Sequence, residues 1–132
     1  GYTYTHTEFL NSFGSNDDLW GEVVAGDQLP YIPQHQFNAM VSLEHTKYEL
    51  NLSGRYNGEF RTQAGSDTIP TDELVASNFI IDFSAKYHFS KFLSVTGNII
   101  NMLDETYAVS RVPAGLRPGH PFGANLGLEF RF

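Results

Sequence analysis

The last eleven residues, Phe122 to Phe132, read FGANLGLEFRF and alternate between apolar side chains and polar or small ones. Successive side chains of a β-strand point to opposite faces, so a period of two predicts a strand with one apolar face. The apolar face carries Phe122, Ala124, Leu126, Leu128, Phe130 and Phe132, and the other face carries Gly123, Asn125, Gly127, Glu129 and Arg131. This stretch therefore predicts a β-strand, and an all-β fold if the pattern recurs upstream.

The same alternation recurs upstream and predicts further strands. Leu50 and Leu52, for example, alternate with Glu49 and Asn51, and Ile80 is the one mismatch in its own stretch. Hairpins and meanders are the shortest connections, so the strands should be antiparallel and pair in sequence order. With the C-terminal stretch, the six predicted strands are 1–9, 36–44, 48–60, 78–89, 92–100 and 122–132.

The connections between these strands differ in length. Residues 44–47 and 89–91 form short turns, whereas 10–34, 61–77 and 101–121 are long and hold all six prolines. A compact soluble domain seldom contains three structureless connections of this length. Transmembrane β-barrels combine short periplasmic turns with long extracellular loops, and their strands of about 9–11 residues match the predicted strand lengths. The sequence therefore predicts an up-and-down, antiparallel transmembrane β-barrel segment.

Aromatic side chains gather near both ends of the predicted strands, around an aliphatic middle. Such bands are typical of the aromatic girdles of outer-membrane barrels. A soluble β-sandwich remains the alternative, because its core also packs aromatic residues behind an alternating pattern. The band near the short turns holds Tyr48, Tyr87, Phe89, Phe130 and Phe132, and the band near the long connections holds Phe37, Phe60, Phe79 and Phe122.

Composition excludes several classes of protein. The chain of 132 residues contains no cysteine, which excludes disulfide scaffolds, Cys-ligated zinc and iron–sulfur clusters. Its net charge of −7 argues against nucleic acid as a partner, because phosphates require a basic surface. No apolar run approaches the ~20 residues of a membrane-spanning helix.

Catalytic and metal-binding patterns are also absent from the sequence. No Gly-x-Ser-x-Gly element and no Gly-rich phosphate loop is present, so we expect neither an enzyme nor a cofactor. His35 and His120 could meet near the long loops, and Asn16, Asp17, Asp18 and Asp67 are loop oxygen donors of the kind that calcium prefers. The histidines lack metal-ligand spacing and solvated loop charge is the simpler explanation, so we expect no metal site.

Charged residues on the polar faces of the strands suggest the wall of a water-filled lumen. Opposite charges on neighbouring strands can pair with one another across such a wall. The residues expected to form it are Glu49, Arg55, Glu59, Asp82, Lys86, Glu129 and Arg131.

Several segments resemble TonB-dependent outer-membrane receptors. Residues 94–107 resemble the family's strand that ends in Asn-Leu-Phe-Asp-x-x-Tyr, with Asn101-Met102-Leu103-Asp104 and Tyr107 filling the pattern. Residues 115–119 and 121–123 resemble the loop before the last strand, and 129–132 resemble the terminal aromatic strand. Leu29-Pro30-Tyr31-Ile32-Pro33-Gln34-His35 resembles the recurrent Leu-Pro-x-x-Pro-x-His segment before another barrel strand. The resemblance covers essentially the whole chain. Within it, the N-terminal stretch GYTYTHTEF, residues 1–9, is most similar to receptors of the ferric-citrate type.

The resemblance implies a transport function in the bacterial outer membrane. Such receptors have about 22 strands around an N-terminal plug, so residues 1–132 would be the C-terminal portion of the barrel, without the plug. The implied activity is import of a ferric chelate or similar scarce nutrient. The implied partners are outer-membrane lipid and lipopolysaccharide, the rest of the barrel and plug, TonB through the missing N-terminal part, and the barrel-assembly machinery.

The resemblance also implies functions for individual residues. Arg61, Arg111 and Arg117 lie in or beside the long loops and could bind an anionic ferric chelate, because arginine presents a fork to carboxylates. Rim charges that face lipopolysaccharide or solvent are the alternative. Phe130 and Phe132 would form the signal that the barrel-assembly machinery recognises, with a simple girdle contribution as the alternative.

Two other function classes remain open from the sequence. One is a soluble all-β domain that binds a ligand or partner and is excised from a larger protein. The other is an outer-membrane enzyme or adhesin barrel that ends in a similar way.

Overall fold

The computed structural model describes residues 1–16, 20–112 and 115–132, and these residues form strands, turns and irregular segments. None of them belongs to a helix that is long and apolar enough to cross a membrane. The chain divides into two compact units. The first, here called the loop unit, comprises Gly1–Phe37, Tyr56–Asn78 and Thr106–Gly119; the second, here called the strand unit, comprises Asn38–Arg55, Phe79–Glu105 and His120–Phe132.

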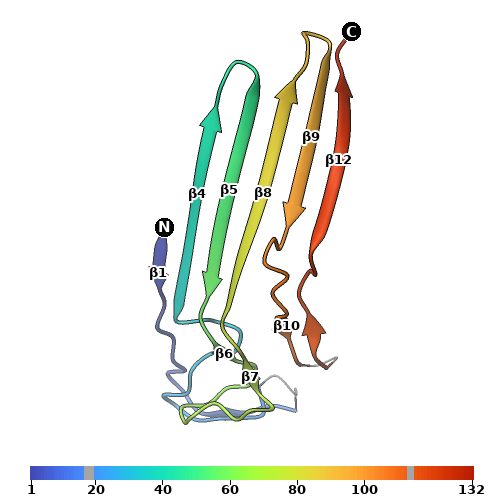
Figure 1. Ribbon diagram of the computed structural model, residues 1–132. Helices are drawn as coiled ribbons and strands as arrows, with labels where there is room; N and C mark the ends of the chain where they lie inside the picture. Colours follow the sequence, from blue (N-terminus) through green and yellow to red (C-terminus); the bar gives the residue numbers. More distant parts are fainter. Residues whose placement is uncertain (17–19, 113–114) are drawn as a thin grey trace. The chain divides into compact units, whose positions relative to one another are not determined.

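Six strands pair in the order β1-β4-β5-β8-β9-β12, which is also their order along the chain. The pairs β1–β4, β8–β9 and β9–β12 are antiparallel, and the arrows of the five long strands alternate in direction (Figure 1). This order confirms the predicted meander. The strands are β1 (Tyr2–Tyr4), β4 (His35–Glu44), β5 (Tyr48–Asn57), β8 (Asn78–His88), β9 (Leu93–Ile100) and β12 (Gly123–Phe130).

The last predicted strand keeps the expected register. Leu126 pairs with Gly97, and Leu128 pairs with Val95, so apolar residues of β12 and β9 share one face. Gly127 lies on the opposite face beside Thr96, where a Cβ atom would approach the Thr96 Oγ1 to 2.7 Å. Glycine is therefore the residue that fits between these strands on that face.

The first strand is shorter than the predicted 1–9. Thr5 N–H still donates to Gln34 O in the register of β1 and β4, but Phe9 N–H donates to Asp27 O, so the backbone has left β4 before the predicted end of the strand. The Thr/Tyr-rich composition favours a strand, but these long-range partners decide where pairing in the sheet ends. The predicted strand 48–60 also divides, since β5 ends at Asn57 and a separate strand begins at Phe60.

The long connections contain small sheets, whereas the sequence predicted structureless loops. Two-residue strands show too little periodicity to be recognised from sequence. Val23 and Val75, each on one of these strands, are buried and form part of the core of the loop unit. The pairs are β2 (Phe13–Gly14) with β3 (Glu22–Val23), β6 (Phe60–Arg61) with β7 (Leu74–Val75), and β10 (Ala108–Ser110) with β11 (Arg117–Pro118).

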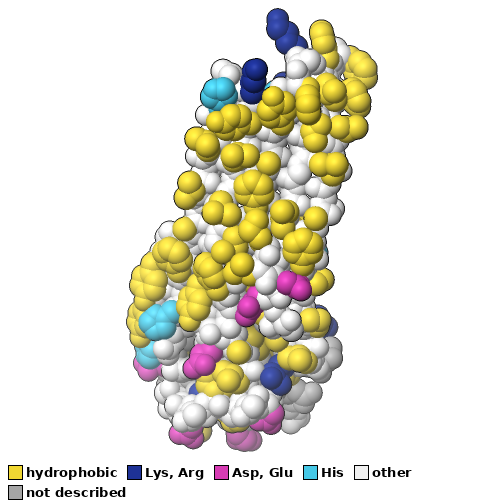
Figure 2. Space-filling model, in the orientation of Figure 1, with side chains coloured by type: hydrophobic (Ala, Val, Ile, Leu, Met, Phe, Trp, Pro, Cys, Tyr) yellow, Lys and Arg dark blue, Asp and Glu magenta, His cyan; other side chains and the backbone are white. Residues whose placement is uncertain are grey.

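One face of the strand unit is apolar and exposed. Leu126 on β12 is 82% exposed, and hydrophobic side chains cover this face of the long strands (Figure 2). A soluble β-sandwich buries its apolar face beneath a second sheet, whereas a barrel strand presents that face to lipid. Other exposed apolar residues of the strand unit include Val41, Leu43, Leu52, Phe79, Tyr87, Leu128 and Phe130.

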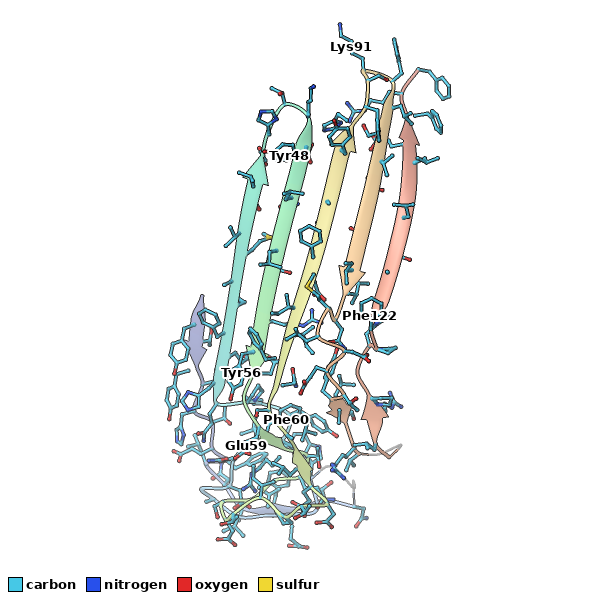
Figure 3. The ribbon with its side chains drawn as sticks, viewed as in Figure 1. Tyr48, Tyr56, Glu59, Phe60, Lys91 and Phe122 are labelled. Carbon is cyan, nitrogen blue, oxygen red and sulfur yellow. The ribbon has the colours of Figure 1, made fainter. Side chains whose placement is uncertain are left out.

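Aromatic rings flank the short turns of the strand unit. Tyr48 lies at the start of β5, at the same end of the sheet as Lys91 in the β8–β9 turn (Figure 3). His45 stacks on Tyr48 with ring centroids 4.8 Å apart, and Tyr87 meets Phe89 edge to face at 4.8 Å. The predicted aromatic band at the short-turn end is therefore present.

Candidate functional site

On the second face of the strand unit, hydrogen bonds between neutral side chains link neighbouring strands. Ser42 Oγ donates to Asn51 Oδ1 over 2.7 Å, and Asn51 Nδ2 donates to Ser84 Oγ over 3.4 Å. These residues come from β4, β5 and β8, and the period of two places all three on the same face. The polar face is thus a continuous network that crosses three strands.

Ion pairs on the polar face follow the predicted pattern. Arg55 lies 3.6 Å from Asp82, and Lys86 Nζ lies 2.5 Å from Glu129 Oε2. Lys86 is on β8 and Glu129 on β12, so this pair spans the intervening strand β9. The prediction that opposite charges pair across the wall is confirmed for these residues.

The predicted wall residues Arg131, Glu49 and Glu59 have different surroundings. Arg131 Nε donates to Glu129 Oε1 over 3.1 Å. Glu49 contacts His88. Glu59 belongs to the loop unit and is exposed, with no ion pair to any residue in the described ranges (Figure 3).

His88 is a member of the polar network that the sequence did not single out. Its Nε2 lies 3.0 Å from Glu49 Oε1, and its Nδ1 lies 2.9 Å from the Oγ of the buried Ser94. The signal was present, because His88 shares the alternating face of Asp82 and Lys86. Without the partner strands, however, a histidine on a polar face carries no specific expectation.

An open hollow of about 550 Å³ lies on the polar face of the strand unit. Its polar lining combines neutral amide and hydroxyl groups with one ion pair, Arg55–Asp82. These polar groups can hydrogen-bond water or a polar solute, and they lie beside an apolar part of the lining formed by Met40, Phe83, Ile99 and Ile100. The lining residues include Asn51, Ser53, Arg55, Asp82, Asn98 and Asn125.

Asn101, the first residue of the Asn-Met-Leu-Asp-x-x-Tyr element, is the centre of the segment after β9. Its side chain is fully buried, with Nδ2 donating to Glu105 O and to His120 O over 2.9 Å each. Its Oδ1 accepts the Glu105 N–H, also over 2.9 Å. A φ of 50° places Asn101 in the left-handed region, which asparagine tolerates better than most residues. Asn101 therefore ends β9 and holds the two ends of the 105–120 segment together.

The other residues of this element make further contacts. Asp104 Oδ1 accepts the Phe122 N–H over 3.2 Å, just before β12. Tyr107, in the loop unit, packs its ring on Gly119, where a Cβ atom would collide with the ring carbons. The Gly119 N–H donates to Tyr107 O over 2.8 Å, so a glycine at this position allows the close approach.

Arg61, the first candidate substrate residue, is buried in the loop unit with only 5% of its surface exposed. Its Nη2 donates to Asp67 O over 2.6 Å, and its guanidinium packs directly on Gly65. Its Nε is buried and has no hydrogen-bond partner in the part of the chain that the structure describes. These contacts make Arg61 a structural support of its loop in this conformation.

Arg111 and Arg117, the other two candidates, also belong to the loop unit. Arg111 Nε donates to Leu74 O over 2.7 Å, and Leu74 pairs with Arg61 across β6–β7. Arg117 pairs with Ser110 on β10–β11 and is exposed. The three arginines thus come from segments linked through β7, β10 and β11, and Arg117 has the most accessible side chain of the three.

Phe130 and Phe132 are exposed, and Phe130 ends β12. A function as an assembly signal stays a prediction for both residues.

No group of three or more His, Asp or Glu residues that could hold a metal occurs within 1–16, 20–112 and 115–132. Asp17 and Asp18 lie outside the described residues. His35 lies 2.8 Å from Tyr2 Oη, and His120 Nδ1 lies 2.6 Å from Pro121 O.

Solved structures of several bacterial receptors share this fold. The ferric-catecholate import receptor Fiu of E. coli K12, in its closed form, matches with a TM-score of 0.68 and 22% identity over 80% of this chain. The ferripyoverdine receptor of the outer membrane of Pseudomonas aeruginosa matches with a TM-score of 0.61 and 16% identity over 80% of the chain. The siderophore receptor PirA of Acinetobacter baumannii matches with a TM-score of 0.57 and 17% identity over 81%.

The chain spans 15% of the length of the first two receptors and 17% of the third. No curated protein sequence matches it. Residues 1–102 match the family model described as TonB dependent receptor-like, beta-barrel. Because this match covers most of the chain, the chain belongs to the TonB-dependent receptor β-barrel family, whose members are receptors of the bacterial outer membrane and not enzymes.

Proposed function

We propose that this chain is the C-terminal portion of the barrel of a receptor that imports a ferric chelate or a similar scarce nutrient. The observation that carries the proposal is the family match of residues 1–102. Residues 101–107 and 129–132 resemble the family's final strands, and all of them except 101 and 102 lie beyond the matched range. This resemblance supports the C-terminal position. The similar solved receptors are named for ferric catecholate, ferripyoverdine and siderophores, which supports an iron chelate as the cargo.

The two faces of the strand unit suit this function. An exposed apolar face can contact the lipid of the outer membrane, while the polar face with its paired charges can line a water-filled lumen. The partners we propose are the rest of the barrel and its plug, TonB through the N-terminal part, lipopolysaccharide, and the assembly machinery acting on Phe130 and Phe132.

Among the candidate arginines, Arg117 is the one we propose to contact the chelate directly. It is exposed, and its guanidinium makes no hydrogen bond or ion pair with residues in the described ranges. Arg111 and Arg61 donate to backbone carbonyls of their own unit, so they would act mainly by supporting the loops. Arginine suits an anionic chelate because its planar fork matches carboxylate oxygens.

The full-length receptor should support iron uptake when it is the sole receptor of its class in a test strain. We expect at least one of a panel of radio-iron chelates, covering catecholate, hydroxamate and citrate types, to enter the cells above the empty-vector level. Arg117→Ala should weaken binding of that chelate about tenfold, as expected for loss of one hydrogen bond to a charged group. Lys47→Ala removes an equal charge from a short turn and should leave binding unchanged. Uptake at the vector level with every chelate would contradict a ferric chelate as the cargo, and unchanged binding in Arg117→Ala would contradict the assigned residue.

A further inference from the structure

Asp82 on β8 connects the polar face to the segment that follows β9. Its Oδ1 accepts the Asn101 N–H over 2.8 Å, and its Oδ2 faces the Arg55 guanidinium at 3.6 Å. The two oxygens of one carboxylate are therefore engaged by two different parts of the strand unit. One partner, Arg55, lies on β5 with about 50% of its side chain exposed, and the other, Asn101, is fully buried.

The side chain of Asn101 forms hydrogen bonds at both ends of the long segment that follows β9. Its amide is hydrogen-bonded to Glu105 and His120. Glu105 is the last residue of the strand unit before the segment and His120 is the first residue after it, so one buried side chain binds both ends. Between these two points lie residues 106–119, which carry Arg111 and Arg117. Here we call Asn101, Glu105 and His120 the loop base.

We propose that Asp82 is a positioning residue that links the polar face to the loop base, and that Arg55 sets how firmly it does so. Arg55 restrains the Asp82 carboxylate so that Oδ1 points at the Asn101 N–H. This inference rests on the proposed function in that the polar face lines the lumen and the 106–119 segment contacts the chelate.

Hydrogen exchange of peptides covering 101–105 in the full-length receptor, held in lipid nanodiscs without substrate, tests the connection. Asp82→Ala leaves the buried Asn101 N–H without its acceptor and should raise exchange about tenfold. Asp82→Asn retains an oxygen acceptor but loses the charge, and Arg55→Gln loses the same ion pair from the other side. Each should raise exchange about threefold, the range expected for a partly exposed ion pair.

The matched control and the double variant make the result decisive. Lys86→Gln removes a different ion pair from the same strand and face, so exchange at 101–105 should equal that of the wild type. Arg55→Gln combined with Asp82→Asn should exchange no faster than either single variant, because both remove one interaction. If Asp82→Ala does not fold, Asp82→Asn and Arg55→Gln still decide the outcome.

Wild-type exchange in Arg55→Gln, equal effects of Arg55→Gln and Lys86→Gln, or additive effects in the double variant would each overturn the proposal. The measurement uses no substrate, so its outcome does not depend on which nutrient the receptor imports. Failure of iron uptake would thus count against the proposed function alone, and unchanged exchange would count against the link through Asp82.

Discussion

Replacing Leu126 with arginine is expected to lower the free energy of unfolding of the full-length receptor barrel by about 2–4 kcal/mol, if Leu126 lies near the bilayer midplane. Leu126 belongs to β12, is 82% exposed, and shares its face with other apolar side chains. On a barrel wall this face meets hydrocarbon, which solvates a guanidinium poorly. Reversible unfolding of the purified receptor in lipid bilayers, with wild type and variant compared under the same conditions, measures the effect.

The neighbouring Asn125 supplies the control for this prediction. Asn125 lies on the opposite face of the same strand and lines the hollow of the polar face. Asn125→Arg places the same charge in an aqueous lumen and should change stability by less than about 0.5 kcal/mol, as is usual for exposed sites. Equal destabilisation by the two arginines would mean that the faces are wrongly assigned.

Replacing Asn101 with alanine is expected to cost about 2–4 kcal/mol of stability, the second large effect. The substitution removes a fully buried amide that makes three hydrogen bonds with Glu105 and His120, and it leaves their backbone groups without these partners. Alanine also tolerates the left-handed φ of 50° less well than asparagine. Denaturant unfolding of the receptor in lipid measures the total loss.

Two further substitutions separate these causes. Asn101→Gly relieves the backbone conformation while still removing the amide, so it should recover only part of the loss. Asn98→Ala removes an exposed asparagine from β9, the strand that precedes Asn101, and should be nearly neutral. If Asn101→Gly were as stable as the wild type, the hydrogen bonds of Asn101 would contribute nothing and the account of the loop base would be wrong.

The strands could be predicted because their signal is local. The alternation of 122–132 and 78–89 depends only on neighbouring residues, and β12 and β8 appear within a few residues of the predicted bounds. Ile80, the one mismatch, lies on the otherwise polar face and is fully buried, which no local pattern could show. The short β1 and the two-residue strands of the loop unit depend on long-range backbone partners, so periodicity could not reveal them.

The candidate site could be predicted only in part. The sequence indicated that Arg55, Asp82, Lys86 and Glu129 would pair across strands, because their faces follow from the alternation. It named Asn101 as part of a family element but could not show its buried partners, which are up to nineteen residues away. Arg61 was placed in a loop, yet the structure buries it against Gly65, a contact that composition does not encode.

Of the alternatives left open by the sequence, the family match decides against a soluble β-domain and against an enzyme barrel. The exposed apolar face agrees with that outcome, since it is the surface that lipid would cover. Substrate contact by Arg61, Arg111 and Arg117 and an assembly signal at Phe130 and Phe132 stay predictions.

The central claim is that one face of this sheet meets lipid and the other meets water. Spin labels on single cysteines along β12 of the full-length receptor in bilayers test it most directly, and the 132 residues contain no native cysteine to remove. Labels at Ala124, Leu126 and Leu128 should relax with lipid-soluble oxygen, whereas labels at Asn125 and Glu129 should relax with a water-soluble nickel chelate. A period of two along the strand is the predicted result, and equal access of the nickel chelate to both sets of positions would contradict the claim.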